Sequence, residues 1–501
     1  MKKTMAILCI VAFVLSIASL GKTYNISIQE KAQQIKTAYK KFEANQEKKN
    51  NPSGKKLEEL INSDSHNSWV KAAKSKHTNK EQLMSLAKKC SQIETDSDCA
   101  RKLTEKILNN KNVTKDIVYE LSSSKFANVL AEISESSHAD EKVLKVIAKS
   151  CVKSPKRDYT ITTIKNICEN KNTTDAVLSE LINIDNHEAL LTIAKSDCLS
   201  KTTLKQLAIK CAEISSCRMH ATDIAKAICN HKSANDAALN ELTKSKYHDI
   251  LNVVARSDKA GKTSLKNVAI KCAEMKNNRD AASRIANNIC SNANTSDEII
   301  NELTKTNYLP ILHSIADSES AGKLSLKSVA IRCAEITNNR DQATNIAYDI
   351  CNNKNSNTEI INELISSKYT EVLGYVIDSQ YSTEATLKEI AIKCAKITNS
   401  QSNAVTLAND ICDSSKATDE VLNELTKSKY NAVLEIISDS NAAGKLTLKS
   451  LAIRCADIKN NKEMAQRIAN NICSNKNATD EILKELAKSK YSSVKDLIKS
   501  K

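Results

Sequence analysis

The sequence predicts an all-α fold: an α-solenoid of about seven 61-residue repeats, each holding four short helices arranged as two helical hairpins. Two observations predict it, namely the composition and a set of residues that recur at one fixed spacing. The 501 residues include only 6 Gly, 3 Pro and 3% aromatic residues. Strands favour aromatic and β-branched residues, and turns favour Gly and Pro, so this composition disfavours sheets.

Two series of cysteines and one series of leucines define the spacing. Neighbouring members of each series are 60 or 61 residues apart. The series are Cys90, Cys151, Cys211, Cys272, Cys333, Cys394 and Cys455; Cys168, Cys229, Cys290, Cys351, Cys412 and Cys473; and Leu121, Leu181, Leu242, Leu303, Leu364, Leu425 and Leu486. Such a period is typical of solenoids, whose short helices bury their apolar faces by stacking on neighbouring repeats.

The elements are predicted in the following order. Residues 1–21 resemble a secretory signal peptide, because Lys2 and Lys3 precede a short apolar stretch that ends in small residues. Residues 22–54 form a charged N-terminal helix and linker, and residues 55–77 resemble the second half of a repeat. The tandem repeats occupy residues 78–138, 139–198, 199–259, 260–320, 321–381, 382–442 and 443–501.

Repeat four illustrates the helices inside one repeat. Leu265, Val268, Ala269 and Cys272 follow the i, i+3, i+4, i+7 spacing of a helix with one buried face. A second such helix and two shorter ones complete the repeat. The third helix has a start signal in every repeat, because Ser, Thr or Asn can accept hydrogen bonds from free first-turn amides. These start residues are Thr114, Thr174, Asn235, Ser296, Asn357, Thr418 and Thr479.

Residues 479–499 (TDEILKELAKSKYSSVKDLIK), whose counterparts in earlier repeats lead into a phrase such as TLKSLAIRCA, resemble HEAT repeats and the leucine-rich repeat variant. The resemblance covers about residues 55–501, and it departs from those families in the 61-residue double period and the paired cysteines. It implies a solenoid that binds other macromolecules along its concave face. No functional residue is implied, because such families share a scaffold and not a chemistry.

The cysteines predict disulfides within repeats. Sixteen remain when Cys9 in the signal peptide is set aside, and an even number in an exported chain favours bridges. The geometry of an antiparallel hairpin disfavours these bridges. It offsets the two cysteines by roughly 9 Å along the helix axis, whereas a bridge needs Cα atoms within about 7 Å. Buried free thiols are therefore the first alternative, and a metal site is disfavoured because no His is periodic. The predicted pairs are Cys90 with Cys99, Cys151 with Cys168, Cys211 with Cys229, Cys272 with Cys290, Cys333 with Cys351, Cys394 with Cys412, and Cys455 with Cys473, while the connectivity of Cys198 and Cys217 stays open.

An aromatic residue also recurs at the repeat period, often directly after a Lys. It defines a candidate binding edge at Phe126, Tyr247, Tyr308, Tyr369, Tyr430 and Tyr491. The rings could stack on glycans or line a site for a linear polyanion. The favoured interpretation is that each ring fills the corner between the third and fourth helices.

Two further motifs have structural interpretations. Asn-x-Ser/Thr sequons occur at Asn25, Asn112, Asn172, Asn294 and Asn477. In the last four, the Ser or Thr is the start residue of the third helix, so capping explains them without glycosylation. Ala-Gly-Lys, at Gly261, Gly322 and Gly444, is interpreted as a glycine that ends a helix.

The functional prediction is a non-enzymatic protein-binding scaffold, adhesin-like or host-directed, that uses the curved face of a disulfide-stapled solenoid and is secreted, extracellular or periplasmic. The net charge of +15 is spread as interleaved Lys and Glu, and catalytic motifs such as His-Glu-x-x-His are missing from the sequence. We expect no cofactor, no metal, no nucleic acid and no membrane span after signal cleavage. A structural spacer or antigen without a ligand is the alternative, and glycan or polyanion binding is less favoured.

Overall fold

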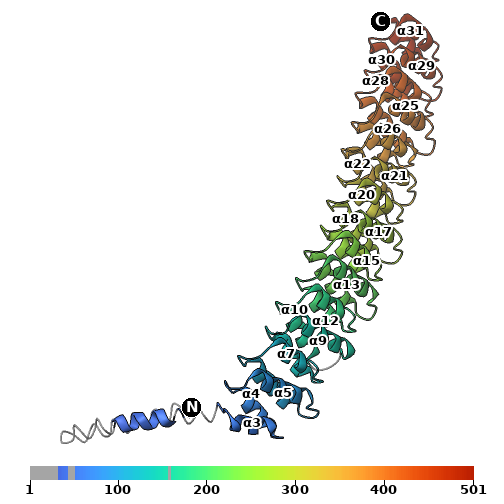
Figure 1. The fold of residues 1–501 in the computed structure, drawn as a ribbon. Helices are drawn as coiled ribbons and strands as arrows, with labels where there is room; N and C mark the ends of the chain where they lie inside the picture. Colours follow the sequence, from blue (N-terminus) through green and yellow to red (C-terminus); the bar gives the residue numbers. More distant parts are fainter. Residues whose placement is uncertain (1–31, 43, 45–50, 156–158, 501) are drawn as a thin grey trace, which may run out of the picture. The chain divides into compact units, whose positions relative to one another are not determined.

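The computed structural model describes residues 32–42, 44, 51–155 and 159–500. The predicted signal peptide, with Cys9, and the sequon at Asn25 lie outside the described residues. Every regular element in the described part of the chain is a helix (Figure 1), which confirms the predicted all-α class. The chain divides into two compact parts, residues 1–199 and residues 200–501. We describe each part by itself.

The N-terminal part begins with a helix over residues 32–42. Gly54, with φ at 55°, precedes the first helix of the predicted half-repeat. The helices are α3 (Lys55–Asn62), α4 (His66–Ala73), α5 (Lys80–Ser91), α6 (Ser97–Leu108), α7 (Lys115–Leu121), α8 (Ala127–Glu135), α9 (Glu141–Lys153), α10 (Thr160–Glu169), α11 (Asp175–Leu181) and α12 (His187–Ala194).

The C-terminal part continues the same alternation of longer and shorter helices. Its elements are α13 (Lys201–Glu213), α14 (Arg218–Asn230), α15 (Asp236–Leu242), α16 (His248–Arg256), α17 (Lys262–Ala273), α18 (Arg279–Cys290), α19 (Asp297–Leu303), α20 (Leu309–Ala316), α21 (Lys323–Ala334), α22 (Arg340–Asn352), α23 (Thr358–Glu363) with a 3-10 turn η1 (Leu364–Ser366), α24 (Thr370–Asp378), α25 (Glu384–Ala395), α26 (Gln401–Asp413), α27 (Asp419–Leu425), α28 (Asn431–Asp439), α29 (Lys445–Ala456), α30 (Lys462–Ser474), α31 (Asp480–Leu486) and α32 (Ser492–Lys499).

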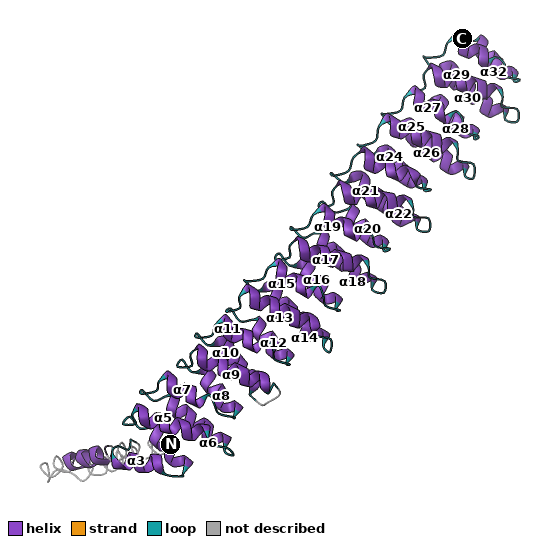
Figure 2. Cartoon of the chain, turned by 45° about the vertical axis from the view of Figure 1, so that its right-hand side comes forward, coloured by secondary structure: helices purple, strands orange, loops and turns teal. Residues whose placement is uncertain are grey.

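The helices of each part form two layers. In the N-terminal part α5 packs on α7 and α7 on α9, while α6 packs on α8 and α8 on α10. In the C-terminal part α13, α15 and α17 form one layer and α14, α16 and α18 form the other, and this order continues to α31 and α32 (Figure 2). We call these the odd and even layers. Stacked hairpins of this kind confirm the predicted α-solenoid, whereas the exact boundaries of the repeats stay predictions.

The core lies between the two layers. Leu265, Val268, Ala269 and Cys272, the apolar stripe predicted for repeat four, are all fully buried. Short helices have little intrinsic stability, so burial of this stripe against neighbouring helices supplies most of what holds them. The small aliphatic composition is therefore a packing requirement of thin layers.

The predicted start residues of the third helices do occupy the N-cap positions of α7, α11, α15, α19, α23, α27 and α31. Asn235, for example, accepts a hydrogen bond from the backbone N–H of Ala238. The positions of these helix starts are thus confirmed, and side-chain caps form at Asn235, Asn357 and Thr418. The four sequon residues at this position make no side-chain cap bond, so capping does not explain the sequons: Thr114, Thr174, Ser296 and Thr479.

The interpretation of Gly261, Gly322 and Gly444 as helix-ending residues is wrong. Each is the N-cap of the helix that follows, and its φ lies between −107° and −96°, outside the left-handed region. Glycine is needed here for space, because a Cβ at Gly322 would lie 2.5 Å from Oδ2 of Asp297. The same close approach joins Gly261 to Asp236 and Gly444 to Asp419.

These aspartates cap the next odd-layer helix in place of the glycine. Asp297, at the start of α19, accepts hydrogen bonds from the backbone N–H groups of Gly322, Leu324 and Ser325 at 2.9, 2.8 and 3.1 Å. Asp236 caps α17 in the same way. Burial tends to raise the pKa of Asp236, but hydrogen bonds from the first turn of α17 outweigh it and lower the pKa. A carboxylate of one repeat therefore caps a helix of the next.

An asparagine ladder also links successive repeats. Asn292 donates from Nδ2 to the carbonyl oxygens of Ala255 and Ser257 at 2.8 and 3.0 Å, and Asn294 donates to Asp258 and Ala260 at 2.9 Å each. Equivalent bonds are made by Asn110, Asn112, Asn170, Asn172, Asn353 and Asn355. The sequon asparagines in this ladder thus use their side-chain amides to join repeats.

Candidate protein-binding surface

A row of isoleucines lies on the outer face of the odd layer in the C-terminal part. Its members are Ile209, Ile270, Ile331, Ile392 and Ile453, which are spaced by 61 residues and lie one each on α13, α17, α21, α25 and α29. The first, third and fifth are 37%, 40% and 43% exposed, and the other two are half-buried. We call this set the isoleucine row.

The isoleucine row stands outside the stripe that each helix buries. On α21 the buried residues include Leu326, Val329, Ala330 and Cys333, and Ile331 points away from them. An apolar side chain repeated at an exposed position contributes little to the core of its own repeat. It can instead contribute apolar area to a partner.

Two exposed leucines extend this surface. Leu324 and Leu446, both 49% exposed, lie seven residues before Ile331 and Ile453, which places them on the same helix face two turns away. The helices α21 and α29 therefore each present two apolar side chains to solvent.

Ion pairs flank the isoleucine row. Each isoleucine follows a Lys by four residues, and that Lys pairs with a Glu of the next odd-layer helix, as in Lys388 with Glu420 at 3.0 Å. The hydrogen bond to Glu420 raises the pKa of Lys388, and an equivalent bond to Glu359 raises the pKa of Lys327. The pairs of Lys327, Lys388 and Lys449 are exposed on both sides and contribute little to stability. They do give the row a regular border of both charges.

After three of the isoleucines, the next residue is basic and donates hydrogen bonds to backbone carbonyl oxygens of the solenoid. Arg332 donates to the carbonyl oxygen of Thr304, and Arg454 donates to that of Thr426, at 3.0 Å each. Lys393 donates to the carbonyl oxygen of Ile365. A cation at the end of a short helix offsets the negative end of its dipole. These side chains therefore fix the layer, and the neighbouring isoleucine stays on the surface.

The predicted aromatic edge lies at the starts of the fourth helices. Phe126, Tyr247, Tyr308, Tyr369, Tyr430 and Tyr491 are the N-cap residues of α8, α16, α20, α24, α28 and α32. The hydroxyl of Tyr247 donates to the carbonyl oxygen of Ser215 at 2.7 Å, and Tyr308 is only 8% exposed. Lys246 lies 5.3 Å over the ring of Tyr247. The hydroxyl of Tyr247 thus reaches the loop between α13 and α14. The predicted corner between the third and fourth helices stays a prediction.

The structure does not support the predicted disulfides. None of the sixteen described cysteines is in a bridge. The pairs that this leaves unformed are Cys90 with Cys99, Cys151 with Cys168, Cys211 with Cys229, Cys272 with Cys290, Cys333 with Cys351, Cys394 with Cys412, and Cys455 with Cys473. The thiols of the two cysteine series contact different neighbouring groups. This is the physical reason why the predicted bridges between the two series are not formed.

Repeat four shows these partners. The thiol of Cys272 donates to the carbonyl oxygen of Ala282 at 3.2 Å, in the first turn of the adjacent helix α18. Cys290 lies beside Ser318, whose hydroxyl donates to the carbonyl oxygen of Cys290 at 3.3 Å. Burial raises the pKa of each thiol to about 12. Both behave as core residues, the alternative that the sequence left open.

Two open grooves lie on the even layer. One, of about 610 Å³, is lined by residues of α14 and α16 that include Lys226, Asp249 and Arg256. The other, of about 780 Å³, lies three repeats further along and is lined in part by Asp413 and Asp439. Asp439 occupies the position of Arg256, so the two grooves differ in charge at equivalent positions. The charge of the groove therefore differs between these repeats, whereas the isoleucine recurs at each of its five positions.

No family model and no curated protein matches the sequence. Among solved structures, an engineered protein is 16% identical with a TM-score of 0.15, over 89% of this chain and 96% of that one. A homology model of the AP-3 complex is 11% identical with a TM-score of 0.28 over 88% of each chain. SYS-1 is 9% identical with a TM-score of 0.28, over 89% of this chain and 98% of that one. Likeness at this level supports no statement about function, so the solenoid assignment rests on the layers described above.

Sequence reasoning missed the isoleucine row. The signal was present in the recurring phrase Ala-Ile-Lys/Arg-Cys-Ala, in which the Ile falls outside the i, i+3, i+4, i+7 stripe of its own helix. An apolar residue that is periodic between repeats but out of phase within its helix is a surface feature. The structure places it on the odd layer.

Proposed function

We propose that this chain is a non-enzymatic scaffold that binds an extended segment of another protein along the isoleucine row. The observation that carries the proposal is an isoleucine at one equivalent position in five odd-layer helices, one per repeat, which is exposed in three of them and half-buried in the other two. Solvated surfaces do not need a repeated apolar side chain. A repeated protein contact does, because each rung adds a similar increment of buried apolar area.

The spacing of the row favours an extended partner. Successive isoleucine-bearing helices have one odd-layer helix between them, which makes two helix-to-helix steps. Helices pack about 8–10 Å apart, so the rungs lie roughly 16–20 Å apart. An extended chain rises about 3.3 Å per residue and spans that distance with roughly five or six residues. The expected partner carries an apolar residue at each such interval, with charges of both signs between them. A small ligand reaches only one rung.

Export is part of the proposal, and its support is the sequence of residues 1–21. A secreted, extracellular or periplasmic location leaves an adhesin-like or host-directed role open to the scaffold. Among the described residues, none of the helices combines the length and the apolar character that a membrane span requires. N-terminal sequencing of protein from the medium or periplasm tests export directly, since an intact Met1 on that protein contradicts signal cleavage.

The experiment on binding compares two sets of variants of the mature chain. Ile209→Ser, Ile331→Ser and Ile453→Ser together remove the three most exposed rungs. Full burial of one Ile is worth about 1.5–3 kcal/mol, so the exposed fraction of each is worth about 1 kcal/mol. Three together predict roughly a hundredfold weaker binding. The matched control is Met219→Ser with Tyr348→Ser, which removes exposed apolar side chains from the even layer.

The readout has two parts. The mature chain captures partners from host or envelope extracts, and hydroxyl-radical footprinting of the complex then shows which side chains the partner protects. Protection of the isoleucine row, with loss of capture in the triple variant alone, supports the proposal. Equal loss in both sets, or protection only on the even layer, contradicts it. Capture of nothing by the unaltered chain favours the structural spacer instead.

A further inference from the structure

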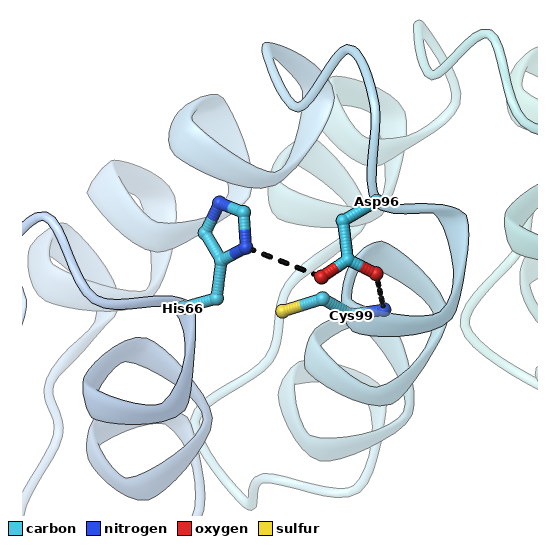
Figure 3. Close-up of side chains that lie close together, drawn as sticks. All are labelled: His66, Asp96 and Cys99. Atoms are coloured by element: carbon cyan, nitrogen blue, oxygen red, sulfur yellow. Dashed lines mark hydrogen bonds and ion pairs between the residues drawn. The ribbon is translucent and has the colours of Figure 1, made fainter.

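Three side chains of different ligand types meet in the N-terminal part. His66 is the first residue of α4, Asp96 is the N-cap of α6, and Cys99 lies in the first turn of α6. Their nitrogen, oxygen and sulfur atoms all lie within 4.8 Å of one another. Figure 3 shows His66 on one side and Asp96 and Cys99 on the other, with the carboxylate and the sulfur turned toward the imidazole.

Neighbouring contacts hold the three side chains in this arrangement. One carboxylate oxygen of Asp96 accepts a hydrogen bond from the backbone N–H of Cys99 at 2.8 Å, and the other lies 3.5 Å from Nδ1 of His66. The ring of His66 packs against Trp69, with centroids 4.9 Å apart, and Nε1 of Trp69 donates to the carbonyl oxygen of Ser63. The cap bond uses one oxygen of Asp96, and the other oxygen faces His66 and Cys99.

The repeats provide an internal comparison. Asn110 bonds to Ala73 and Ser75 as Asn292 bonds to Ala255 and Ser257, so positions 182 residues apart are equivalent. At the equivalent junctions of the C-terminal part the three positions hold His248, Asn278 and Ala281; Leu309, Asn339 and Gln342; Thr370, Ser400 and Asn403; and Asn431, Asn461 and Met464. Those junctions pack without a thiol, and without a carboxylate at the cap. The solenoid itself therefore does not require His66, Asp96 and Cys99.

We propose that His66, Asp96 and Cys99 bind one divalent transition-metal ion of the zinc type, with a fourth position open to water or to a ligand from a partner. Imidazole nitrogen, carboxylate oxygen and thiolate sulfur form a ligand set that suits zinc, whereas magnesium and calcium take oxygen ligands. On binding, the Cys99 thiol exchanges its proton for a metal–sulfur bond, and the proton passes to solvent.

The geometry needs only a small closure. Zinc bonds of about 2.0–2.3 Å place tetrahedral ligands roughly 3.5 Å apart. His66 and Asp96 already have this separation, and the remaining distances, at most 4.8 Å, must shorten by about 1 Å. The side chains of His66 and Asp96 are 35% and 48% exposed, which leaves them room to turn and leaves an entry path for the ion. The N-terminal ends of α4 and α6 disfavour a cation here. Two anionic ligands, carboxylate and thiolate, offset that field.

A bridge between Cys90 and Cys99, expected from the sequence, is the rival use of the same thiol. In the structure the thiol of Cys90 lies 3.3 Å from both the carbonyl oxygen of Ala100 and the hydroxyl of Thr104. Cys90 thus already has partners on α6, and Cys99 faces His66 and Asp96 instead. A bridge and a metal site exclude each other, which makes them separable by experiment.

The test titrates the reduced, metal-free full chain with cobalt(II) and then with zinc(II). We expect one equivalent of cobalt with a thiolate-to-cobalt charge-transfer band, and loss of that band when zinc displaces it. Three variants take residues that the chain itself uses at equivalent positions: Asp96→Asn, Cys99→Ala and His66→Asn. Each should weaken zinc binding by at least about tenfold, and Cys99→Ala should abolish the band. Cys198→Ser, at an exposed cysteine, is the matched control and should change neither.

A transplant provides the second, independent arm. Asn278→Asp with Ala281→Cys places the same three ligand types beside His248, and the doubly substituted chain should bind a second equivalent of cobalt. Retention of the charge-transfer band in Cys99→Ala overturns the proposal, as does absence of cobalt binding to the unaltered reduced chain. Recovery of Cys90 joined to Cys99 from the native protein overturns it as well. Should Cys99→Ala fail to fold, Asp96→Asn and the transplant still decide the question.

Discussion

The link between Asp297 and Gly322 can be tested by exchanging one capping arrangement for another. In the next repeat the equivalent residues are Thr358 and Thr383, and Thr383 caps α25 itself by accepting a hydrogen bond from the backbone N–H of Thr386. The perturbation is therefore Asp297→Thr, Gly322→Thr and the double substitution, which recreates an arrangement that the chain already contains.

Each single substitution should destabilise α21. Asp297→Thr removes the acceptor of the N-cap N–H and of two first-turn N–H groups, and Gly322 offers no side chain in its place. Loss of a cap costs about 0.5–2 kcal/mol, and loss of the charge at the helix start adds about 0.3–1 kcal/mol, so we expect about 2 kcal/mol. Gly322→Thr puts a Cβ 2.5 Å from the Asp297 carboxylate, an overlap that costs about 1–3 kcal/mol to relieve.

The double substitution should recover most of this loss, because the threonine introduced at position 322 neither meets a carboxylate nor leaves α21 without a cap. Its net cost is expected within about 0.5 kcal/mol, so the two substitutions couple by roughly 3 kcal/mol. The assay is hydrogen exchange of peptides from Lys323–Ala334, because solenoid stability is local. A loss of about 2 kcal/mol lowers protection there roughly thirtyfold. Peptides from Lys445–Ala456, capped by Asp419, serve as the unchanged control.

Additive costs in the double variant refute the reasoning. Additivity means that Asp297 and Gly322 act independently, so the glycine is not there to admit the carboxylate. Equal loss of protection in Lys323–Ala334 and Lys445–Ala456 refutes a different step, namely that the cap acts on its own junction alone.

Three further outcomes are expected. Burial raises the pKa of Cys272 to about 12, so at about pH 8 iodoacetamide should modify exposed Cys198 on the order of a thousandfold faster; similar rates under native conditions contradict this. The lowered pKa of Asp236 means that its contribution is present above about pH 4 and is lost as the pH falls through the lowered value. Amide hydrogen exchange, corrected for intrinsic rates, should then show that α17 loses protection in acid whereas α25, capped by Thr383, does not. Identical acid profiles of the two helices contradict a stabilising role of the Asp236 carboxylate. Asn294, whose Nδ2 is bonded to two carbonyl oxygens, should stay unglycosylated in a eukaryotic secretion host, and full occupancy measured by mass spectrometry is the contrary result.

Sequence alone determined the features that depend on local periodicity. The buried stripe of α17 follows from the 3.6-residue turn, which puts Leu265, Val268 and Cys272 on one face whatever lies opposite. The starts of three of the third helices follow from capping, since Asn235, Asn357 and Thr418 each accept from an amide three residues away. Both are short-range properties of the chain, and both are confirmed.

Only the tertiary structure decided contacts between residues about 25 to 40 positions apart. The role of Gly322 depends on Asp297, and that of Asn292 on Ala255, and neither partner is close in the sequence. The cysteines show the same limit: an even count suggested bridges, but the rotation of each helix directs Cys272 toward a backbone carbonyl. Whether Ile331 is buried or exposed likewise depends on which face the neighbouring helices cover. Periodicity fixes the angle of a side chain about its own helix axis, whereas stacking fixes what that side chain meets.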